Sequence, residues 1–258
     1  MKRVLTALAL IPLIVYVVLW GPGWLFLAVL TAVALICFYE YAGIASAHGF
    51  GKLGPVAYVA GLWVLLAGQQ DILFLTIFAL AVLVLAMRAQ DLAKALPYAG
   101  ATVLGVVYIF GAWKCAWLLR IESPYWLMFA LGLNWIGDIA AYYVGRRLGR
   151  HKLAPRVSPN KSWEGAAASL AASMLFGYVY MHVLLPQVHV WQAVALAGAA
   201  NAAGQMGDLA ESAIKRGAGV KDSGTILPGH GGLLDRVDST LFALPVIYFC
   251  VRTLAPSR

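Results

Sequence analysis

The sequence predicts an all-α, polytopic integral membrane protein with about nine transmembrane helices. Of its 258 residues, 62% are hydrophobic and only 12% are charged, whereas a soluble domain has roughly 25% charged residues. Apolar segments, most of them about 16–22 residues long, recur along the whole chain, and that length is close to what a helix needs to cross a bilayer. These segments lack the alternation of apolar and polar residues that is typical of membrane β-strands.

The chain divides into an N-terminal transmembrane region, residues 1–120, and a C-terminal region, residues 121–258. The first contains five predicted helices, at about 4–20, 24–41, 55–68, 72–87 and 98–119. The segment at 4–20 is similar to a signal peptide, but it is longer and no cleavage site of small residues follows, so we expect it to remain as a membrane helix. Gly21-Pro22-Gly23 predicts a tight turn after it. Glu40, at the end of the second helix, is interpreted as an interfacial carboxylate.

The C-terminal region contains four more predicted helices, at about 125–144, 163–185, 190–210 and 239–254. Two polar segments, 145–162 and 212–238, lie between them. With the N-terminus in the cytoplasm, 15 of the 19 Lys and Arg residues fall on the cytoplasmic side, ten of them in these two segments. Cytoplasmic loops are enriched in Lys and Arg. We therefore expect a multi-pass protein of the inner (cytoplasmic) membrane whose two polar loops, and any active site, face the cytoplasm.

The segment 212–238 combines residue types that bind phosphate groups. Glycines let backbone N–H groups approach phosphate oxygens, and Lys and Arg neutralise phosphate charge. A histidine between glycines could donate to a phosphate or act as a general acid or base. The candidate site residues here are Ser212, Lys215, Arg216, Lys221, Gly229, His230, Gly231, Gly232, Arg236 and Asp238.

Two aspartates, one shortly before this segment and one near its end, are candidate metal ligands. Asp208 belongs to a polar stripe that exists if the preceding helix continues past residue 210, and Asp235 precedes the last predicted helix. The stripe consists of Asn201, Gln205, Asp208, Ser212 and Lys215. Both aspartates could hold one Mg²⁺ whose shell phosphate oxygens complete. The alternative is that such residues serve the helix ends, with Asp238 and Ser239 capping the last helix.

Residues 158–165 form a second candidate site, where the helix predicted at 163–185 begins. Ser162 is a candidate N-cap. Lys161 puts a cation at the positive end of that helix, which is unfavourable unless an anionic ligand binds the free N–H groups there. The alternative is a basic residue that attracts anionic lipid at the membrane surface. Ser158 and Asp138 complete the candidate set, since a carboxylate within a membrane helix is costly and commonly functional.

The stretch from Ser212 to Asp238 follows the pattern S-x-φ-K-R-x4-K-D-x-small-x2-φ-P-x-H-G-G-φ-x-D-R-φ-D, in which φ is apolar. It resembles the signature of the phosphatidate cytidylyltransferase (CDP-diacylglycerol synthase) family. Residues 158–165 are similar to that family's S-P-x-K-[ST]-W-E-G motif, and residues 135–145 to its W-x2-D-x2-A-Y-x2-G element. The resemblance covers about residues 135–239. It departs from the family at Ile139, where a Ser or Thr is frequent.

The resemblance implies a nucleotidyltransferase that converts CTP and phosphatidate to CDP-diacylglycerol and pyrophosphate in phospholipid biosynthesis, with Mg²⁺ as cofactor. It also implies a metal centre at Asp208 and Asp235, and a homodimer. The residues suit this chemistry. A phosphate monoester has a second pKa of about 6, so near neutral pH it is mostly doubly ionised and is itself the nucleophile, and no catalytic Ser or Cys is required. The catalytic roles then fall to Lys161, Lys215, Lys221, His230 and Arg236. The expected partners are nucleotide and membrane lipid, and not nucleic acid.

Two other functions fit part of the sequence. A CTP-dependent lipid kinase, such as a polyprenol kinase, needs similar phosphate and metal ligands but releases CDP instead of pyrophosphate. An ion-coupled transporter is suggested by Asp138 and Lys114 inside predicted helices. Transporters place polar residues near the membrane midplane between paired repeats, however, whereas seven of the eleven acidic residues here lie in the second half of the chain.

Overall fold

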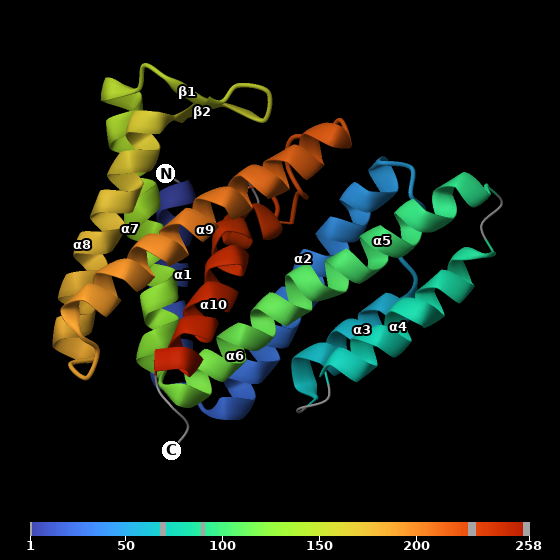
Figure 1. The fold of residues 1–258 in the computed structure, drawn as a ribbon, viewed down its shortest axis with the longest axis horizontal. Helices are drawn as coiled ribbons and strands as arrows, with labels where there is room; N and C mark the ends of the chain where they lie inside the picture. Colours follow the sequence, from blue (N-terminus) through green and yellow to red (C-terminus); the bar gives the residue numbers. More distant parts are fainter. Residues whose placement is uncertain (1, 68–70, 89–90, 227–230, 255–258) are drawn as a thin grey trace. The chain divides into compact units, whose positions relative to one another are not determined.

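The computed structural model describes residues 2–67, 71–88, 91–226 and 231–254, and it is predominantly α-helical (Figure 1). The helices are α1 (Lys2–Leu19), α2 (Gly23–Ala47), α3 (Pro55–Leu66), α4 (Asp71–Ala86), η1 (Leu92–Lys94), α5 (Ala95–Gly105), η2 (Val106–Gly111), α6 (Ala112–Glu122), α7 (Pro124–Leu148), α8 (Trp163–Leu184), α9 (Val190–Gly217) and α10 (Leu234–Leu254). The strands are β1 (Lys152–Ala154) and β2 (Ser158–Ser162). The predicted all-α class is therefore confirmed apart from this one short hairpin.

Four of the described helical segments are long and apolar enough to cross a membrane. They are Gly23–Ala47, Leu92–Glu122, Pro124–Leu148 and Trp163–Leu184, and two shorter apolar helices lie at Pro55–Leu66 and Ile72–Ala86. Large apolar side chains are exposed along several of them; Trp63, Leu83 and Val183 are 55%, 48% and 67% exposed. Such surfaces suit lipid rather than water. The chain is an integral membrane protein.

The described chain forms two compact units, each discontinuous in sequence. Unit 1 comprises Met1–Pro22, Cys115–Ala213 and Val237–Arg258, and unit 2 comprises Gly23–Lys114 and Ile214–Arg236. Helices α9 and α10 both pass from one unit into the other, so the polar segment that joins them belongs to unit 2 while most of their length belongs to unit 1.

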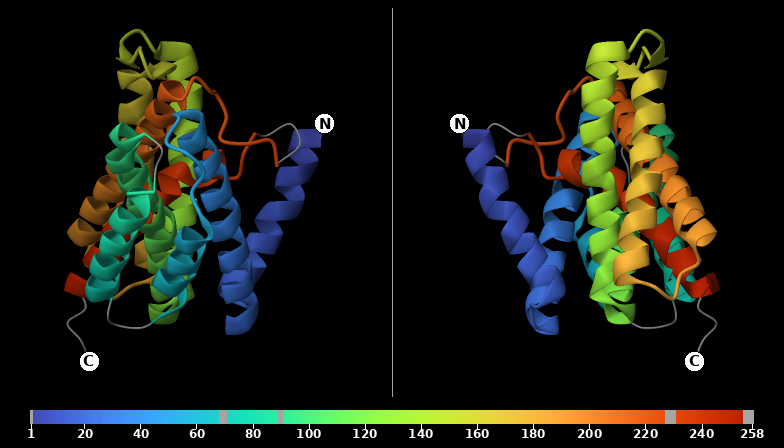
Figure 2. Two further views of the ribbon diagram at one scale, coloured as in Figure 1. Left: turned by 90° about the vertical axis from the view of Figure 1, so that its right-hand side faces the viewer. Right: turned by 90° about the vertical axis from the view of Figure 1, so that its left-hand side faces the viewer.

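Small residues allow the helices of unit 1 to pack closely. Helices α7 and α8 lie side by side along their length and are joined by the β1–β2 hairpin (Figure 2). A Cβ atom on Gly177 of α8 would lie 2.4 Å from the Cβ of Ala197 on α9. One on Gly207 of α9 would lie 2.7 Å from the ring of Phe242 on α10. Small residues at contacts let membrane helices approach, which favours van der Waals packing.

The hairpin is an element that the sequence analysis did not predict. Strands β1 and β2 are antiparallel, with Lys152 opposite Ser162 and Ala154 opposite Ser158. Strand β2 ends where α8 begins, and the Ser162 hydroxyl accepts a hydrogen bond from the Gly165 N–H at 3.2 Å. The prediction that Ser162 caps this helix is confirmed, and the cap fixes Lys161 immediately before the first helical turn.

Unit 2 has an aromatic core that its helices share. Phe38 of α2 packs against Phe110 of the π-helical turn η2, with ring centroids 5.3 Å apart, and Tyr41 of α2 packs against Tyr108 of the same turn, with centroids 6.4 Å apart. Two glycines admit these rings, because a Cβ atom on Gly61 or on Gly105 would lie 2.1 or 2.4 Å from a ring carbon of Phe110 or Tyr41. This packing secures α2, which carries Glu40 in its C-terminal half.

Candidate functional site

Unit 1 contains a polar cavity of about 600 Å³. Helices α7, α8, α9 and α10 and the β1–β2 hairpin all contribute to its wall. Its acidic and basic lining residues are Asp138, Arg146, Lys152, Lys161 and Asp208. This volume is in the range of small-molecule sites, and the lining mixes cations, carboxylates and amides. The cavity can therefore bind a polar ligand that carries phosphate groups.

Lys161 and Asp208 form an ion pair in this cavity. The Lys161 Nζ lies 2.5 Å from Asp208 Oδ2, and the two side chains are 27% and 32% exposed. Asp208 Oδ1 accepts a longer hydrogen bond of 3.4 Å from the Ser212 hydroxyl one turn along α9. The cation predicted to bind an anion and the carboxylate predicted to bind a metal are thus neighbours, brought together from β2 and α9.

Part of the cavity wall belongs to a network of amides and hydroxyls. Asn201 donates to the Ser169 and Ser173 hydroxyls at 3.0 and 2.9 Å, and Gln205 donates to the Asn201 carbonyl oxygen at 2.6 Å. Asn134 donates to the Thr240 hydroxyl at 3.1 Å. Buried polar groups that are mutually satisfied in this way hold a wall in one arrangement. Helix α9 continues to Gly217, so the prediction that Asn201, Gln205 and Asp208 share a helical stripe is confirmed.

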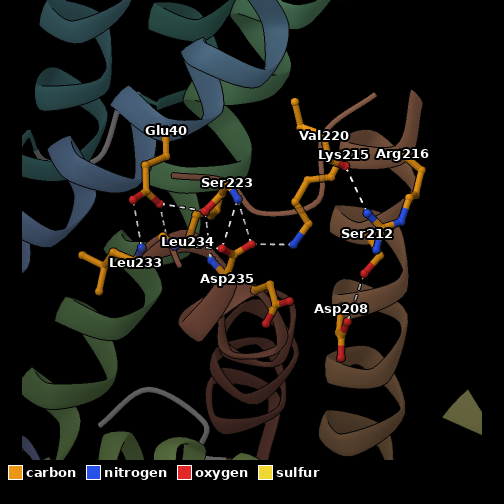
Figure 3. A network of polar contacts seen from close by, with 12 residues as sticks. Glu40, Asp208, Ser212, Lys215, Arg216, Val220, Ser223, Leu233, Leu234 and Asp235 are labelled. Atoms are coloured by element: carbon orange, nitrogen blue, oxygen red, sulfur yellow. Dashed lines mark hydrogen bonds and ion pairs between the residues drawn. The ribbon is translucent and has the colours of Figure 1, made fainter. Parts of the chain in front are cut away.

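Unit 2 contains a second polar group, which we call the loop cluster: Glu40, Lys215, Ser223 and Asp235 (Figure 3). Lys215 Nζ lies 2.5 Å from Asp235 Oδ1, and these side chains are only 8% and 9% exposed. The Ser223 N–H lies 3.0 Å from each Asp235 carboxylate oxygen, and the Gly232 N–H donates to Oδ2 at 2.8 Å. Asp235 therefore has both a cation and backbone donors around it.

Asp235 lies in the first turn of α10, before the apolar part of that helix. Burial by itself raises the pKa of a carboxyl. The ammonium of Lys215 and the N–H groups of Gly232 and Ser223 oppose burial, and together they lower the pKa of Asp235 below its usual value. Asp235 is consequently held as a carboxylate.

Glu40 and Ser223 are the members of the loop cluster that the sequence analysis did not assign to a site. Glu40 lies on α2, is only 2% exposed, and accepts hydrogen bonds from the Ser223 hydroxyl and the Leu233 and Leu234 N–H groups at 2.9, 2.9 and 2.8 Å. Glu40 is buried and hydrogen-bonded within unit 2, a role that its interpretation as an interfacial carboxylate did not include. A carboxylate near the end of an apolar helix was the only signal in the sequence, and it did not identify partners nearly 200 positions away.

Comparison with known proteins adds the family. The model of the cytidylyltransferase family matches residues 1–254. The chain belongs to the cytidylyltransferase family. It is 32% identical over 257 residues to the phosphatidate cytidylyltransferase of Staphylococcus aureus (strain COL), which covers 95% of this chain and 97% of that protein. It is 34% identical over 263 residues to the corresponding protein of Staphylococcus saprophyticus, with 95% and 97% covered. Identity to the phosphatidate cytidylyltransferase of Brucella suis biovar 1 is 35% over 252 residues, with 95% and 91% covered.

The structure of this cytidylyltransferase-family chain places the predicted site residues in two groups. Asp138, Lys161, Ser162 and Asp208 line the polar cavity of unit 1. Lys215 and Asp235 pair in the loop cluster of unit 2. Lys221 is exposed on the segment that joins α9 to α10, and Arg216 and Arg236 are exposed in the adjoining turns of α9 and α10. The Arg216 guanidinium donates to the Val220 carbonyl at 3.1 Å. Gly229 and His230 lie outside the described residues.

Two glycines of the signature have structural roles within the loop. The Gly232 N–H is already bonded to Asp235. Gly231 has φ of +78°, a conformation that favours glycine. In the same segment, helix α10 begins at Leu234, so the alternative in which Asp238 and Ser239 cap it is wrong. Asp238 is 8% exposed in the second turn, and its Oδ1 accepts from the Ser239 N–H at 2.7 Å.

The cavity contains one of the two predicted Mg²⁺ ligands, Asp208, whereas the other, Asp235, belongs to the loop cluster. Asp138 and Asp208 line one cavity, and Mg²⁺ is commonly held by one or two carboxylates plus substrate phosphates. Among the residues that the structure describes, no three His, Cys, Asp or Glu side chains gather to hold a metal by themselves. A magnesium ion bound here would therefore depend on phosphate oxygens to complete its shell.

Proposed function

We propose that this protein transfers the cytidylyl group of CTP to phosphatidate, which gives CDP-diacylglycerol and pyrophosphate. The observation that carries the proposal is the polar cavity, in which Lys161, Arg146 and Lys152 are cations suited to phosphate groups and Asp208 is a carboxylate suited to a metal. The relatives named phosphatidate cytidylyltransferase support the choice of substrates.

In this reaction the protein aligns the two substrates and neutralises phosphate charge, and it does not supply a nucleophile. A phosphate oxygen of phosphatidate attacks the α-phosphorus of CTP. The bond between that phosphorus and the oxygen that bridges the α- and β-phosphates breaks, and pyrophosphate leaves. The phosphate monoester is mostly doubly ionised near neutral pH. Positioned cations lower the barrier by stabilising charge on the oxygens around the phosphorus.

The proposed residue roles are charge neutralisation, substrate binding and metal binding. Lys161, Lys215, Lys221, His230 and Arg236 neutralise or donate to phosphate oxygens. The groups proposed to bind the substrates are Asp138, Ser158, Ser162, Ser212, Arg216, Gly229, Gly231, Gly232 and Asp238. Asp208 and Asp235 are proposed as ligands of Mg²⁺, which when bound supplies charge stabilisation at the phosphates. Residues 121–258 would thus form the catalytic region and residues 1–120 the N-terminal transmembrane region.

The decisive experiment uses purified protein in detergent with phosphatidate, Mg²⁺ and each nucleoside triphosphate in turn. Pyrophosphate, CDP and the lipid product are all measured. We expect equal amounts of pyrophosphate and CDP-diacylglycerol, formed with CTP. Release of CDP with a phosphorylated lipid would instead indicate the lipid kinase, and nucleotide-independent flux into proteoliposomes would indicate a transporter.

We further propose nine transmembrane helices in the inner membrane, with a cytoplasmic N-terminus, cytoplasmic loops 145–162 and 212–238, and a homodimeric assembly. The distribution of Lys and Arg supports this orientation. After replacement of Cys37, Cys115 and Cys250, single cysteines at the exposed positions Asn160 and Thr225 should react only with a reagent applied from the cytoplasmic side.

A cysteine at Gln187 provides the matched control, because it is also exposed and should react only from the opposite side. Labelling of Asn160→Cys or Thr225→Cys from the outer side would contradict the orientation. Crosslinking in native membranes, compared with light scattering of the purified protein, tests the dimer.

A further inference from the structure

The carboxylate of Glu40 is buried in an apolar helix yet fully engaged. Its residue is 2% exposed, and both of its oxygens accept hydrogen bonds, Oε1 from the Leu233 N–H and Oε2 from the Leu234 N–H and the Ser223 hydroxyl. A buried carboxylate is costly unless such donors surround it. The donors come from the segment that joins α9 to α10 and from the first residue of α10, so Glu40 connects α2 to this part of unit 2.

Two of these donors mark the start of α10. Leu234 is its first residue and Leu233 precedes it. The first N–H groups of a helix have no partner within the helix, and an anion next to them is stabilised by the helix dipole. Glu40 thus caps the start of α10 from a different helix.

Ser223 joins this cap to Asp235. Its hydroxyl donates to Glu40 Oε2 at 2.9 Å, while its backbone N–H contacts both oxygens of Asp235 at 3.0 Å. The Asp235 N–H in turn donates to the Ser223 hydroxyl at 3.3 Å. The orientation of the Asp235 carboxylate is therefore coupled to the position of Glu40 through one residue (Figure 3).

Two glycines leave the space that Glu40 occupies. A Cβ atom on Gly224 would lie 2.6 Å from Glu40 Oε1, and one on Gly232 would lie 2.5 Å from Oε2 and 2.0 Å from the Ser223 hydroxyl oxygen. Neither approach is possible for a residue with a side chain unless something shifts. These glycines admit the glutamate, which is a role separate from any contact with phosphate.

We propose that Glu40 is a positioning residue for the reaction: it holds Ser223 and the first turn of α10 so that Asp235 keeps the orientation that catalysis needs. The proposal rests on the proposed cytidylyltransferase function. Glu40 lies outside the stretch that carries the sequence resemblance, and its role is exerted through Asp235 and not on the substrates.

The test compares Glu40→Gln with Glu40→Asp in purified protein. A glutamine keeps the size of the side chain but replaces one accepting oxygen with an NH₂ group, so at least one of the three donors loses its acceptor in either orientation. We expect kcat to fall at least tenfold and the Mg²⁺ concentration for half-maximal activity to rise, with the KM for phosphatidate changing less than threefold. Glu122→Gln is the matched control, because it makes the same change at a carboxylate whose side chain is 43% exposed. This variant should behave as wild type.

A paired substitution tests the geometry itself. Gly224→Ala should displace the Glu40 carboxylate and lower kcat in the same way as Glu40→Gln. Glu40→Asp withdraws the carboxylate by one methylene, so the double variant should be more active than Gly224→Ala alone. A double variant that only multiplies the two losses would overturn the steric coupling.

Hydrogen exchange gives a readout that does not depend on activity. The N–H groups of Ser223, Leu233 and Leu234 should exchange faster in Glu40→Gln than in wild type, and Ser223→Ala should show the same change if Glu40→Gln does not purify. Wild-type exchange together with wild-type kcat and Mg²⁺ requirement would overturn the inference. If wild-type protein itself makes no CDP-diacylglycerol, the proposed function fails, whereas the exchange result still decides whether Glu40 positions the segment.

Discussion

The polar cavity of unit 1 and the loop cluster of unit 2 use the same residue types in opposite ways. In the cavity, Lys161 and Asp208 are about 30% exposed and each faces open space as well as its partner. In the loop cluster, Lys215 and Asp235 are less than 10% exposed, and backbone N–H groups surround the carboxylate. A Lys–Asp pair is therefore partly open to solvent in one unit and shielded from solvent in the other.

The difference in exposure determines whether each Lys–Asp pair contributes mainly to ligand binding or also to stability. An ion pair that is open to solvent is weak and exchanges readily for a charged ligand. A buried pair is strongly destabilised when one partner is removed, because the other charge is left without compensation. We accordingly expect substitutions in the cavity to change kinetics with little effect on folding, and substitutions in the loop cluster to affect both.

The largest effect is expected from the proposed metal ligands, one in each region. Asp208→Asn or Asp235→Asn keeps the size of the side chain but removes an anionic ligand, and we expect kcat/KM to fall about a thousandfold, since metal charge stabilisation is worth several kcal/mol. If both aspartates act through one ion, the double variant should be about as inactive as either single variant.

Excess Mg²⁺ or Mn²⁺ should rescue the single variants better than the double variant. The two regions also predict a contrast, because Asp235→Asn should lower the unfolding temperature in detergent more than Asp208→Asn does. Losses that simply multiply, with no rescue by metal, would mean that the two aspartates have separate functions.

The next effect concerns Lys161. Lys161→Ala should lower kcat/KM with CTP and phosphatidate more than tenfold, because the residue places a cation where α8 begins and lines the cavity beside Asp208. Thermal unfolding should be nearly unchanged, since the pair with Asp208 is partly exposed.

Arg156→Ala is the matched control, since Arg156 is an exposed cation in the turn of the same hairpin. It should leave the kinetics with both substrates unchanged. If Lys161→Ala and wild type have equal kinetics, Lys161 is a basic residue of the membrane surface and does not bind the substrates.

The smallest effect is expected from the cap of α8. Ser162→Ala removes the acceptor of the Gly165 N–H and should lower the free energy of unfolding by about 1 kcal/mol. Ser162→Thr keeps a capping hydroxyl and should retain most of that stability. Ser158→Ala, on the same strand, serves as the comparison. A Ser162→Ala variant as stable as wild type would show that the cap contributes nothing measurable.

Much of the fold was predictable because it depends on local sequence. Apolar runs of sufficient length predict membrane helices wherever they occur, since the backbone must satisfy its own hydrogen bonds in lipid. The α8 cap at Ser162 and the helical stripe of Asn201, Gln205 and Asp208 are local as well, because both follow from spacing along one helix. The motifs around Lys161 and Asp235 are contiguous, so the family resemblance was visible in the chain itself.

Tertiary structure decided which of these polar residues are neighbours. The Lys161–Asp208 pair joins a strand to a helix that begins almost thirty residues later, and Glu40 bonds to Ser223 across 183 positions. No periodicity encodes such contacts, because they depend on how helices pack. The sequence by itself determined the helices, the polar segments and the family; packing alone decided that Lys161 lies in an open cavity, that Lys215 is buried, and that a glutamate of α2 caps the helix carrying Asp235.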